Sequence, residues 1–277
     1  MSALLLKLIA IFTMFADHLG VACKDIFSAT ELGDVYYLLR AVGRLSLPIF
    51  AFLIANGFKY TKSAPKYALR LFCFALISEI PFDLFIWGKV TVINFKGILP
   101  DIMFDNVFFT LFIGFVFLWL RDIYKKRGLK HAKLLTFATY IAGILLAAFI
   151  SADYGAVGVS WIALFGILDV EERKNLPFVF AGAAVLAYWN MISRCILVLV
   201  YRLTGINLVG IPGVSVFFAG YHPIMSLIQA VSLVSLGIIL FYNGKSGKTG
   251  NKTVDTAVKY GFYVFYPLHL LILYFVF

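Results

Sequence analysis

Two adjacent residues that can do acid–base chemistry, Asp17 and His18, lie in a long apolar stretch near the start of the chain. A charge inside a membrane span costs about 2.5–3.5 kcal/mol on insertion scales, so such residues are paired or functional. Histidine titrates near neutral pH, and an acid beside it commonly fixes its tautomer. Neighbouring helical residues diverge by about 100°, so both side chains can line one groove but cannot simply satisfy each other. We therefore predict a functional role for His18.

Two basic and two acidic residues form matching pairs in the next apolar runs. Arg40 and Arg44 are spaced i,i+4, as are Glu79 and Asp83, so each pair shares one helix face. At 1.5 Å per residue, the arginines lie about 6 and 12 Å below the outer end of their helix. The acids of the following helix fall at about the same two depths. The pattern predicts Arg40–Asp83 and Arg44–Glu79 ion pairs, which either hold the two helices together or take part in binding or catalysis.

Other polar residues reach the same outer layer of the membrane. They are Asn106, Tyr154 and His269. His269 lies about 12 Å deep by the same rise, while Asp17 and His18 lie about 6 to 8 Å deep. A lipid-facing position for so many polar groups is implausible, and a shared cavity is the economical inference. For His269 an alternative is a hydrogen bond to a backbone carbonyl that Pro267 leaves free.

The composition explains how these residues are positioned. Of 277 residues, 62% are hydrophobic and only 14% are charged, which is more apolar surface than a soluble core could bury. A bilayer core about 30 Å thick needs roughly 20 helical residues. We therefore predict an all-α, polytopic membrane bundle that forms one domain, 1–277, of about nine transmembrane helices. The apolar runs place the spans near 5–22, 36–58, 67–87, 103–120, 133–151, 155–169, 176–190, 225–241 and 260–277.

Four further segments and residue groups complete the organisation. Residues 191–224 are interrupted by Arg, Gly and Pro, which favours a short or re-entrant helix. The Gly- and Lys-rich segment Asn243 to Lys252 is typical of a flexible linker. The first apolar run lacks a convincing cleavage site, so we expect it to be retained as a helix. The three cysteines are scattered, so neither a disulfide framework nor a metal site is predicted.

The net charge of +10 sits in alternate short loops. The basic loops lie at 59–70, 121–133, 173–174 and 245–259, and the intervening loops are near neutral. This is the positive-inside pattern of a membrane protein, so no nucleic-acid partner is expected. The basic loops are therefore predicted to be cytoplasmic, with the N-terminus inside and, after nine spans, the C-terminus outside.

Six short motifs carry a family resemblance. They are Asp17-His18-Leu19-Gly20, Gly43-Arg44-Leu45-Ser46-Leu47-Pro48-Ile49-Phe50-Ala51-Phe52, Ser78-Glu79-Ile80-Pro81-Phe82-Asp83, Asn106-Val107-Phe108-Phe109-Thr110, Tyr154-Gly155 and Tyr266-Pro267-Leu268-His269. Their order and spacing resemble the TraX family, which is named for a conjugation protein that N-acetylates pilin. That family is similar to multi-pass membrane acyltransferases that modify envelope sugars and to heparan glucosaminide N-acetyltransferase, in which cytosolic acyl-CoA serves an acceptor on the far side. The resemblance implies that Asp17 and His18 are the catalytic pair and that Arg44 contacts the acyl donor or the oxyanion.

We accordingly predict a plasma-membrane acyltransferase. It would move an acetyl or other acyl group from acetyl-CoA or another acyl-CoA to an amine or hydroxyl of an envelope acceptor, which could be a protein N-terminus, a glycan or a lipid. His18 would be the general base and Asp17 its orienting residue, while Arg44 and Asn106 would stabilise charge. The predicted substrate-binding residues are Glu79, Asp83, Asn106, Tyr154, His269 and Arg40.

Two other classes of function remain open. A proton-coupled transporter or lipid flippase could use the same intramembrane charges as a relay. The sequence has no apparent internal repeat, which disfavours many transporter folds. In the third class, a non-enzymatic assembly factor, His18 would be replaceable.

Overall fold

The computed structural model describes residues 1–90, 93–96, 99–102, 104–206 and 223–277. Nearly all of the regular structure in these ranges is helical. The elements are α1 (Ala3–Ala22), α2 (Lys24–Ser28), α3 (Gly33–Gly43), α4 (Ser46–Tyr60), α5 (Ala64–Trp87), β1 (Ile93–Lys96), β2 (Leu99–Ile102), α6 (Val107–Lys126), α7 (Ala132–Phe149), α8 (Gly155–Ile167), η1 (Arg173–Asn175), α9 (Leu176–Ala187), α10 (Trp189–Thr204), α12 (Pro223–Gln229), η3 (Ala230–Leu233), α13 (Val234–Leu240) and α14 (Lys252–Val276).

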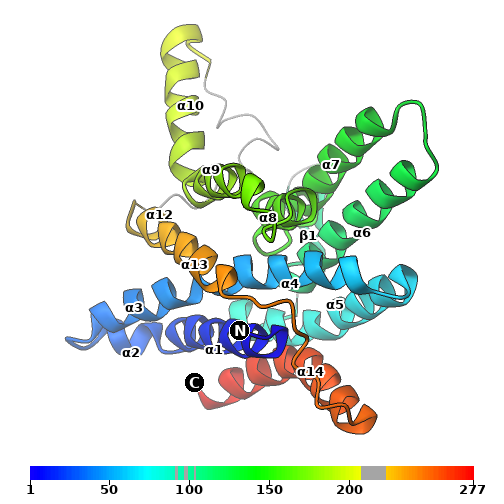
Figure 1. The fold of residues 1–277 in the computed structure, drawn as a ribbon. Helices are drawn as coiled ribbons and strands as arrows, with labels where there is room; N and C mark the ends of the chain where they lie inside the picture. The colour runs from blue at the N-terminus through cyan, green and yellow to red at the C-terminus, as the bar shows by residue number, and fades with distance from the viewer. Residues whose placement is uncertain (91–92, 97–98, 103, 207–222) are drawn as a thin grey trace.

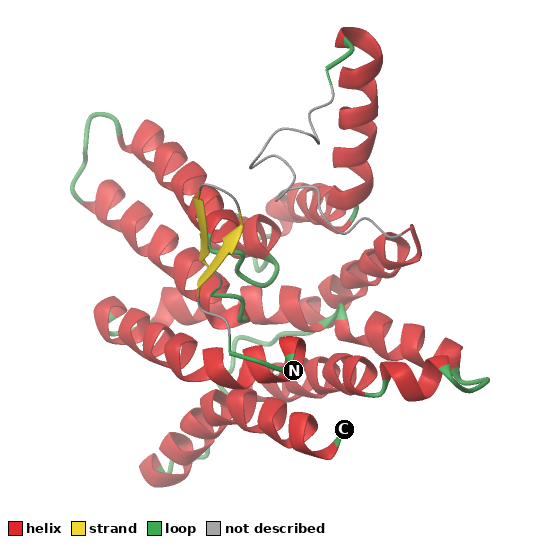
Figure 2. Cartoon of the chain, turned by 180° about the vertical axis from the view of Figure 1, so that it is seen from behind, coloured by secondary structure: helices red, strands yellow, loops and turns green. Residues whose placement is uncertain are grey.

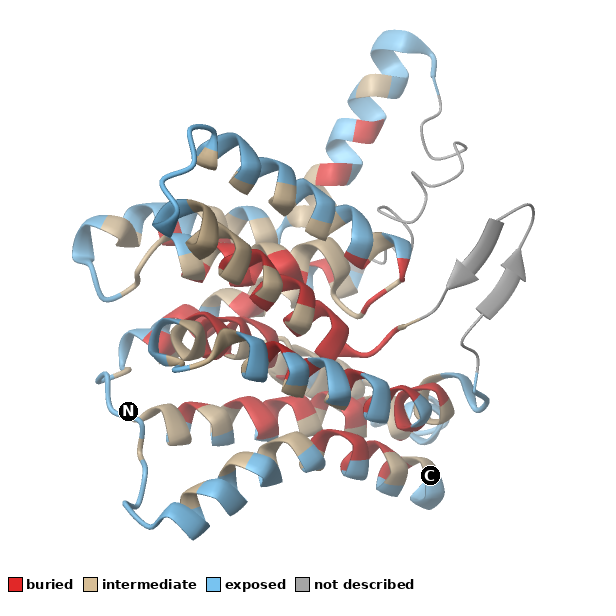
Figure 3. Cartoon of the chain, turned by 90° about the vertical axis from the view of Figure 1, so that its right-hand side faces the viewer, coloured by how far each residue is buried: buried red, intermediate tan, exposed pale blue. Residues whose placement is uncertain are grey.

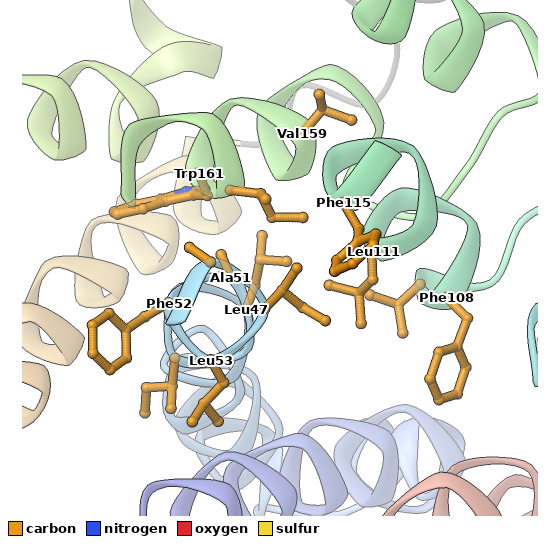
Figure 4. Close-up of a cluster of buried hydrophobic side chains, with 14 of the residues drawn as sticks. Leu47, Ala51, Phe52, Leu53, Phe108, Leu111, Phe115, Val159 and Trp161 are labelled. Carbon is orange, nitrogen blue, oxygen red and sulfur yellow. The ribbon is translucent and has the colours of Figure 1, made fainter. Parts of the chain in front are cut away.

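Helix α4 lies at the centre of the bundle. It packs against α1, α6, α8 and α13, while α5 packs between α6 and α14 (Figure 1). Leu47 and Ala51 of α4 lie between Trp161 of α8 and the side chains of Leu111 and Phe115 of α6 (Figure 4). All five are buried, because each of these helices turns an apolar face toward α4.

Among the residues that the structure describes, length and apolar composition identify five helices that could cross a membrane, or six if the bent pair α9 and α10 forms one span. The five are Ala3–Ala22, Gly33–Tyr60, Val107–Lys126, Ala132–Phe149 and Lys252–Val276. Their outer faces carry exposed apolar side chains, such as Phe12 at 70% and Phe137 at 62% (Figure 3). Apolar surface of this extent suits contact with lipid rather than water. The fold is therefore a helical bundle of the membrane type.

The predicted helix 36–58 is broken into α3 and α4. Pro48 lies in the first turn of α4, where its missing N–H removes the backbone bond to the Arg44 carbonyl. Gly33–Tyr60 still has the length of one span, 28 residues, with a turn at Arg44 and Leu45 between the two helices.

Several other boundaries differ from the prediction. The last helix starts at Lys252 instead of near residue 260, because the Asn251 side chain accepts hydrogen bonds from the first turn of α14. Helix α6 starts at Val107 and extends to Lys126, and Asn106 caps it in the same way. Helices α9 and α10 meet at 66°, which leaves a 16-residue helix within the segment predicted to be short or re-entrant. The part of that segment at 207–222 lies outside the described residues.

A short antiparallel hairpin of β1 and β2 pairs Ile93 with Ile102 and is a small addition to the predicted helical fold (Figure 2). One finding corrects the sequence interpretation more directly. The segment predicted to be a flexible linker is bonded to the start of the chain. Ala3 donates its backbone N–H to the Lys245 carbonyl at 2.8 Å, and Asn243 donates to Met1 at 2.9 Å. The sequence offered no sign of these long-range bonds.

Candidate functional site

Asp17 joins Arg40 of α3 and Arg44, which directly follows the last residue of α3. Arg40 Nη1 lies 2.6 Å from Asp17 Oδ2, and Arg44 Nη2 lies 2.9 Å from Asp17 Oδ1. The predicted Arg40–Asp83 and Arg44–Glu79 pairs are therefore wrong. The i,i+4 spacing does place both arginines on one helix face, but α3 turns that face toward α1.

Gly43 makes this ion-pair cluster possible. A Cβ at this position would overlap with Cβ, Cγ and Oδ1 of Asp17. Only a residue without a side chain lets α1 approach α3 closely enough for the carboxylate to reach both arginines. Gly43 was missed as a site residue, although a glycine directly before an intramembrane arginine was a usable signal.

Arg44 has further partners from distant segments. Its guanidinium donates to Gln229 Oε1 of α12 at 3.4 Å and, through Nε, to the Arg40 carbonyl at 3.2 Å. The guanidinium also lies over the ring of Tyr154, with Cζ 5.7 Å from the ring centroid. Tyr154 adopts a left-handed backbone conformation (φ 59°) where α8 begins. Gln229 was not predicted, because nothing in its local sequence distinguishes it from an ordinary helical glutamine.

Asp153 is a second unpredicted neighbour, in the turn between α7 and α8. Its backbone N–H donates to the Asp105 carbonyl at 2.7 Å, and its own carbonyl accepts from the Thr110 hydroxyl. Burial raises the pKa of the Asp153 carboxyl to about 7, and the positive charge of Arg44 only partly offsets this effect. The turn thus brings a readily protonated acid close to the Asp17 cluster.

His18 pairs with His269 rather than with Asp17. His18 Nδ1 lies 2.6 Å from His269 Nε2, and the two rings stack with centroids 5.0 Å apart. In the described part of the chain no hydrogen bond joins Asp17 to His18, because adjacent residues point to different sides of α1. The residue that orients His18 is therefore His269, which corrects the role predicted for Asp17.

The bonds of His269 determine both tautomers. Its Nδ1 lies 2.8 Å from the Phe265 carbonyl, and a carbonyl can only accept, so Nδ1 carries the proton. In a neutral ring Nε2 is then an acceptor, so His18 donates from Nδ1 and its Nε2 keeps a free lone pair. Pro267 has no N–H to donate to the carbonyl of Tyr263, four residues earlier, so that carbonyl is the one left free. The structure instead pairs His269 with the Phe265 carbonyl, which differs from the predicted alternative. The pair of rings presents an unprotonated nitrogen at His18.

Glu79 and Asn106 form a separate buried group. The Asn106 amide nitrogen donates to the Ala75 carbonyl at 2.8 Å and to Glu79, and Glu79 Oε1 accepts the Asp105 backbone N–H at 3.1 Å. Both amide hydrogens of Asn106 are thereby used, and its oxygen caps α6. These bonds fix α5 to the start of α6 and leave Asn106 no donor for an oxyanion. Asp83 lies one turn further along α5 and is fully buried.

The predicted residues thus form three groups in one layer instead of one cavity lining. Asp17 lies with Arg40, Arg44 and Tyr154; His18 lies with His269; Glu79 lies with Asn106. A cavity of about 520 Å³ approaches them from the other half of the bundle, between α1, α4, α5, α6 and α14. Its lining includes Tyr266, whose ring centroid is 6.2 Å from that of His18 and 5.7 Å from that of His269. The cavity therefore ends beside the histidine pair.

Fold and site together define a helical membrane protein with buried charges and a histidine pair in its interior. The TraX protein family model matches residues 2–277, so the chain belongs to the TraX family. A relative from Dichelobacter nodosus, named "Probable fimbrial assembly protein FimC, serogroup H1", is 28% identical over 273 residues, which cover 98% of this chain and 94% of the relative.

A second relative is an uncharacterised protein of Rickettsia prowazekii (strain Madrid E). It is 26% identical over 176 residues, which cover 62% of this chain and 57% of that protein. No solved structure matches the chain.

Proposed function

We propose that this chain is an acyltransferase that moves an acetyl or other acyl group from cytosolic acyl-CoA to an amine or hydroxyl on the outer side of the plasma membrane. The observation that carries the proposal is the His18–His269 pair at the end of the cavity. It leaves a lone pair on His18 Nε2, which is what a general base requires. The proposal includes nine spans, with the N-terminus inside and the C-terminus outside.

The proposed reaction is a direct transfer. The acceptor nitrogen or oxygen attacks the thioester carbonyl, His18 Nε2 takes its proton, and the CoA thiolate leaves and is then protonated by His18. His269 acts as a positioning residue that fixes the reactive tautomer of His18. Arg44 uses three of its five N–H groups on Asp17, Gln229 and Arg40, so donors remain for a developing oxyanion.

Asp17 takes a different role in this proposal from the one expected of it. It holds Arg40 and Arg44 in place by two ion pairs, and it acts on the reaction only through Arg44. Tyr154 supports the Arg44 guanidinium from below, while Glu79 and Asn106 fix the adjoining helices. The substrate-binding contacts of Arg40 and Asp83 remain predictions.

The acceptor is proposed to be a protein amine exposed in the envelope. Among a protein, a glycan and a lipid, a protein is favoured by the name of the Dichelobacter relative, which assigns that protein to fimbrial assembly. An N-terminal amine would need a base to remove its proton before attack, which is the role proposed for His18.

The test uses purified protein reconstituted in liposomes with radiolabelled acetyl-CoA. Wild type should hydrolyse the thioester or pass label to an envelope acceptor, and His18→Ala should reduce the rate by about 10²–10⁴-fold, the usual share of a general base. His131→Ala is the matched control, because His131 is exposed at the start of α7 and should have no effect. Equal rates for wild type and His18→Ala, or no acyl transfer by either, would refute the proposal. Proton or lipid flux that depends on His18 without acyl transfer would favour the transporter alternative.

A further inference from the structure

Four basic side chains gather at the cavity end away from the histidine pair. Lys7, Arg70, Lys248 and Lys259 line it, from α1, α5, the loop after α13 and α14. Lys7 is near enough to Lys248 and Lys259 for the charges to repel each other. No carboxylate lines the cavity among the described residues, and none of the four cations forms an ion pair there. Like charges held together around a cavity that no described carboxylate lines indicate a site for an anion.

The loop at this end has the composition of a phosphate-binding loop. Residues 244–250 read Gly-Lys-Ser-Gly-Lys-Thr-Gly, and the three glycines have φ of 73°, 72° and 85°. Glycine adopts this left-handed conformation without strain, and it lets backbone N–H groups approach a phosphate closely. Ser246 and Lys248 of the loop line the cavity. Asp255, the carboxylate that contacts the loop, is already bonded by the backbone and hydroxyl of Thr249.

Two buried polar groups on the cavity wall also lack a partner. Tyr266 is only 3% exposed, yet its hydroxyl has no hydrogen bond among the described residues. The Nε atom of Arg70 is also buried and has no hydrogen-bond partner among these residues. Buried donors without partners are rare, so both groups indicate a ligand that supplies acceptors. Tyr266 lies beside His18, and α1 rises by about 16 Å over the eleven steps from Lys7 to His18.

We propose that Lys7, Arg70, Lys248 and Lys259, with Gly244 and Ser246 of the loop, bind the phosphate groups of a nucleotide-type ligand whose chain runs along the cavity to Tyr266. The proposal rests on the proposed function, because it assigns the phosphate end of the acyl donor to this site. The thioester of such a donor would reach the histidine pair while its phosphates stay at the cytoplasmic surface. The acceptor would then enter from the opposite side.

The test measures binding instead of chemistry. Purified full-length protein in phosphatidylcholine nanodiscs is titrated with CoA, with adenosine 3′,5′-bisphosphate and with pantetheine, which lacks the phosphates. Wild type should bind the two phosphorylated probes but not pantetheine. Lys248→Met/Lys259→Met should weaken binding by about tenfold or more, since each replacement removes a charge-assisted contact. In the transfer assay the same variant should raise KM and leave kcat unchanged.

Lys245→Met is the matched control. Lys245 has the same charge and lies in the same loop, but it is exposed and does not line the cavity, so its removal should change affinity by less than about twofold. Unchanged CoA affinity in the double variant would overturn the proposal, as would a complete lack of binding by the phosphorylated probes. Competition only by added phosphatidylglycerol would also overturn it, because the site would then bind a lipid headgroup.

The outcomes separate this proposal from the proposed function. If CoA binds and the double variant loses it, yet no acyl transfer occurs, the phosphate site stands and the acyltransferase proposal fails. If transfer occurs with an unchanged KM in the double variant, the acyltransferase proposal stands and the phosphate site is wrong.

Discussion

The Asp17 cluster predicts a large stability effect for one isosteric substitution. Asp17→Asn keeps the volume of the side chain but removes the charge that compensates Arg40 and Arg44. The Asp17 and Arg44 side chains are only 9% and 12% exposed, whereas Arg40 is 21% exposed. Breaking a buried ion pair from one side costs about 3–5 kcal/mol, because the partner charge stays buried without compensation. The better solvated Arg40 contributes the smaller part of this loss.

The assay is equilibrium unfolding of purified protein in mixed micelles, followed by tryptophan fluorescence. Asp17→Asn should lower the free energy of unfolding by about 3–5 kcal/mol, and Arg44→Gln should destabilise more than Arg40→Gln. Asp25→Asn is the matched control, because Asp25 is exposed on α2 and its loss should matter by less than about 0.5 kcal/mol. If Asp17→Asn unfolds like wild type but loses acyl transfer, Asp17 acts directly in the chemistry and the positioning role is refuted.

Three further predictions follow from the geometry. Gly43→Ala should lower the free energy of unfolding by about 1–3 kcal/mol, because the added methyl group would overlap with the Asp17 carboxylate. Gly261→Ala is the control, because the space around Gly261 is open. Similar unfolding of both variants would contradict the close contact between Gly43 and Asp17. Because the folded-state pKa of Asp153 is raised to about 7 from 3.8, its stabilising contribution is full below pH 3.8 and is lost as the pH rises through 7. Unfolding of wild type and Asp153→Asn between pH 5 and 8 checks this, and parallel curves would refute it. An alkaline phosphatase fused after Phe277 should be active, because the proposed topology places the C-terminus outside the cell. The same enzyme fused after Arg127 should be inactive, because that loop is proposed to be cytoplasmic. The reverse pattern would show that the proposed topology is inverted.

Composition and apolar periodicity were sufficient to predict the class of fold. An apolar run long enough to cross the bilayer forms a helix because no other conformation satisfies its backbone there, and this holds whatever the run packs against. The sequence alone also identified His18 and Asp17 as candidate functional residues. Placing a titratable side chain within an apolar span costs free energy, wherever its partner lies in the fold.

Only the tertiary structure decided which groups meet. The rise per residue gives the depth of a side chain but not the direction in which its helix is rotated. Arg40 and Arg44 match the predicted depths of Asp83 and Glu79, yet both pair with Asp17, and the missing side chain of Gly43 leaves room for that carboxylate. The same applies to His18, whose partner is 251 residues away on α14. Loop 244–250 likewise depends on the N-terminus, because the Lys245 carbonyl accepts a hydrogen bond from Ala3 and the preceding Asn243 donates one to Met1.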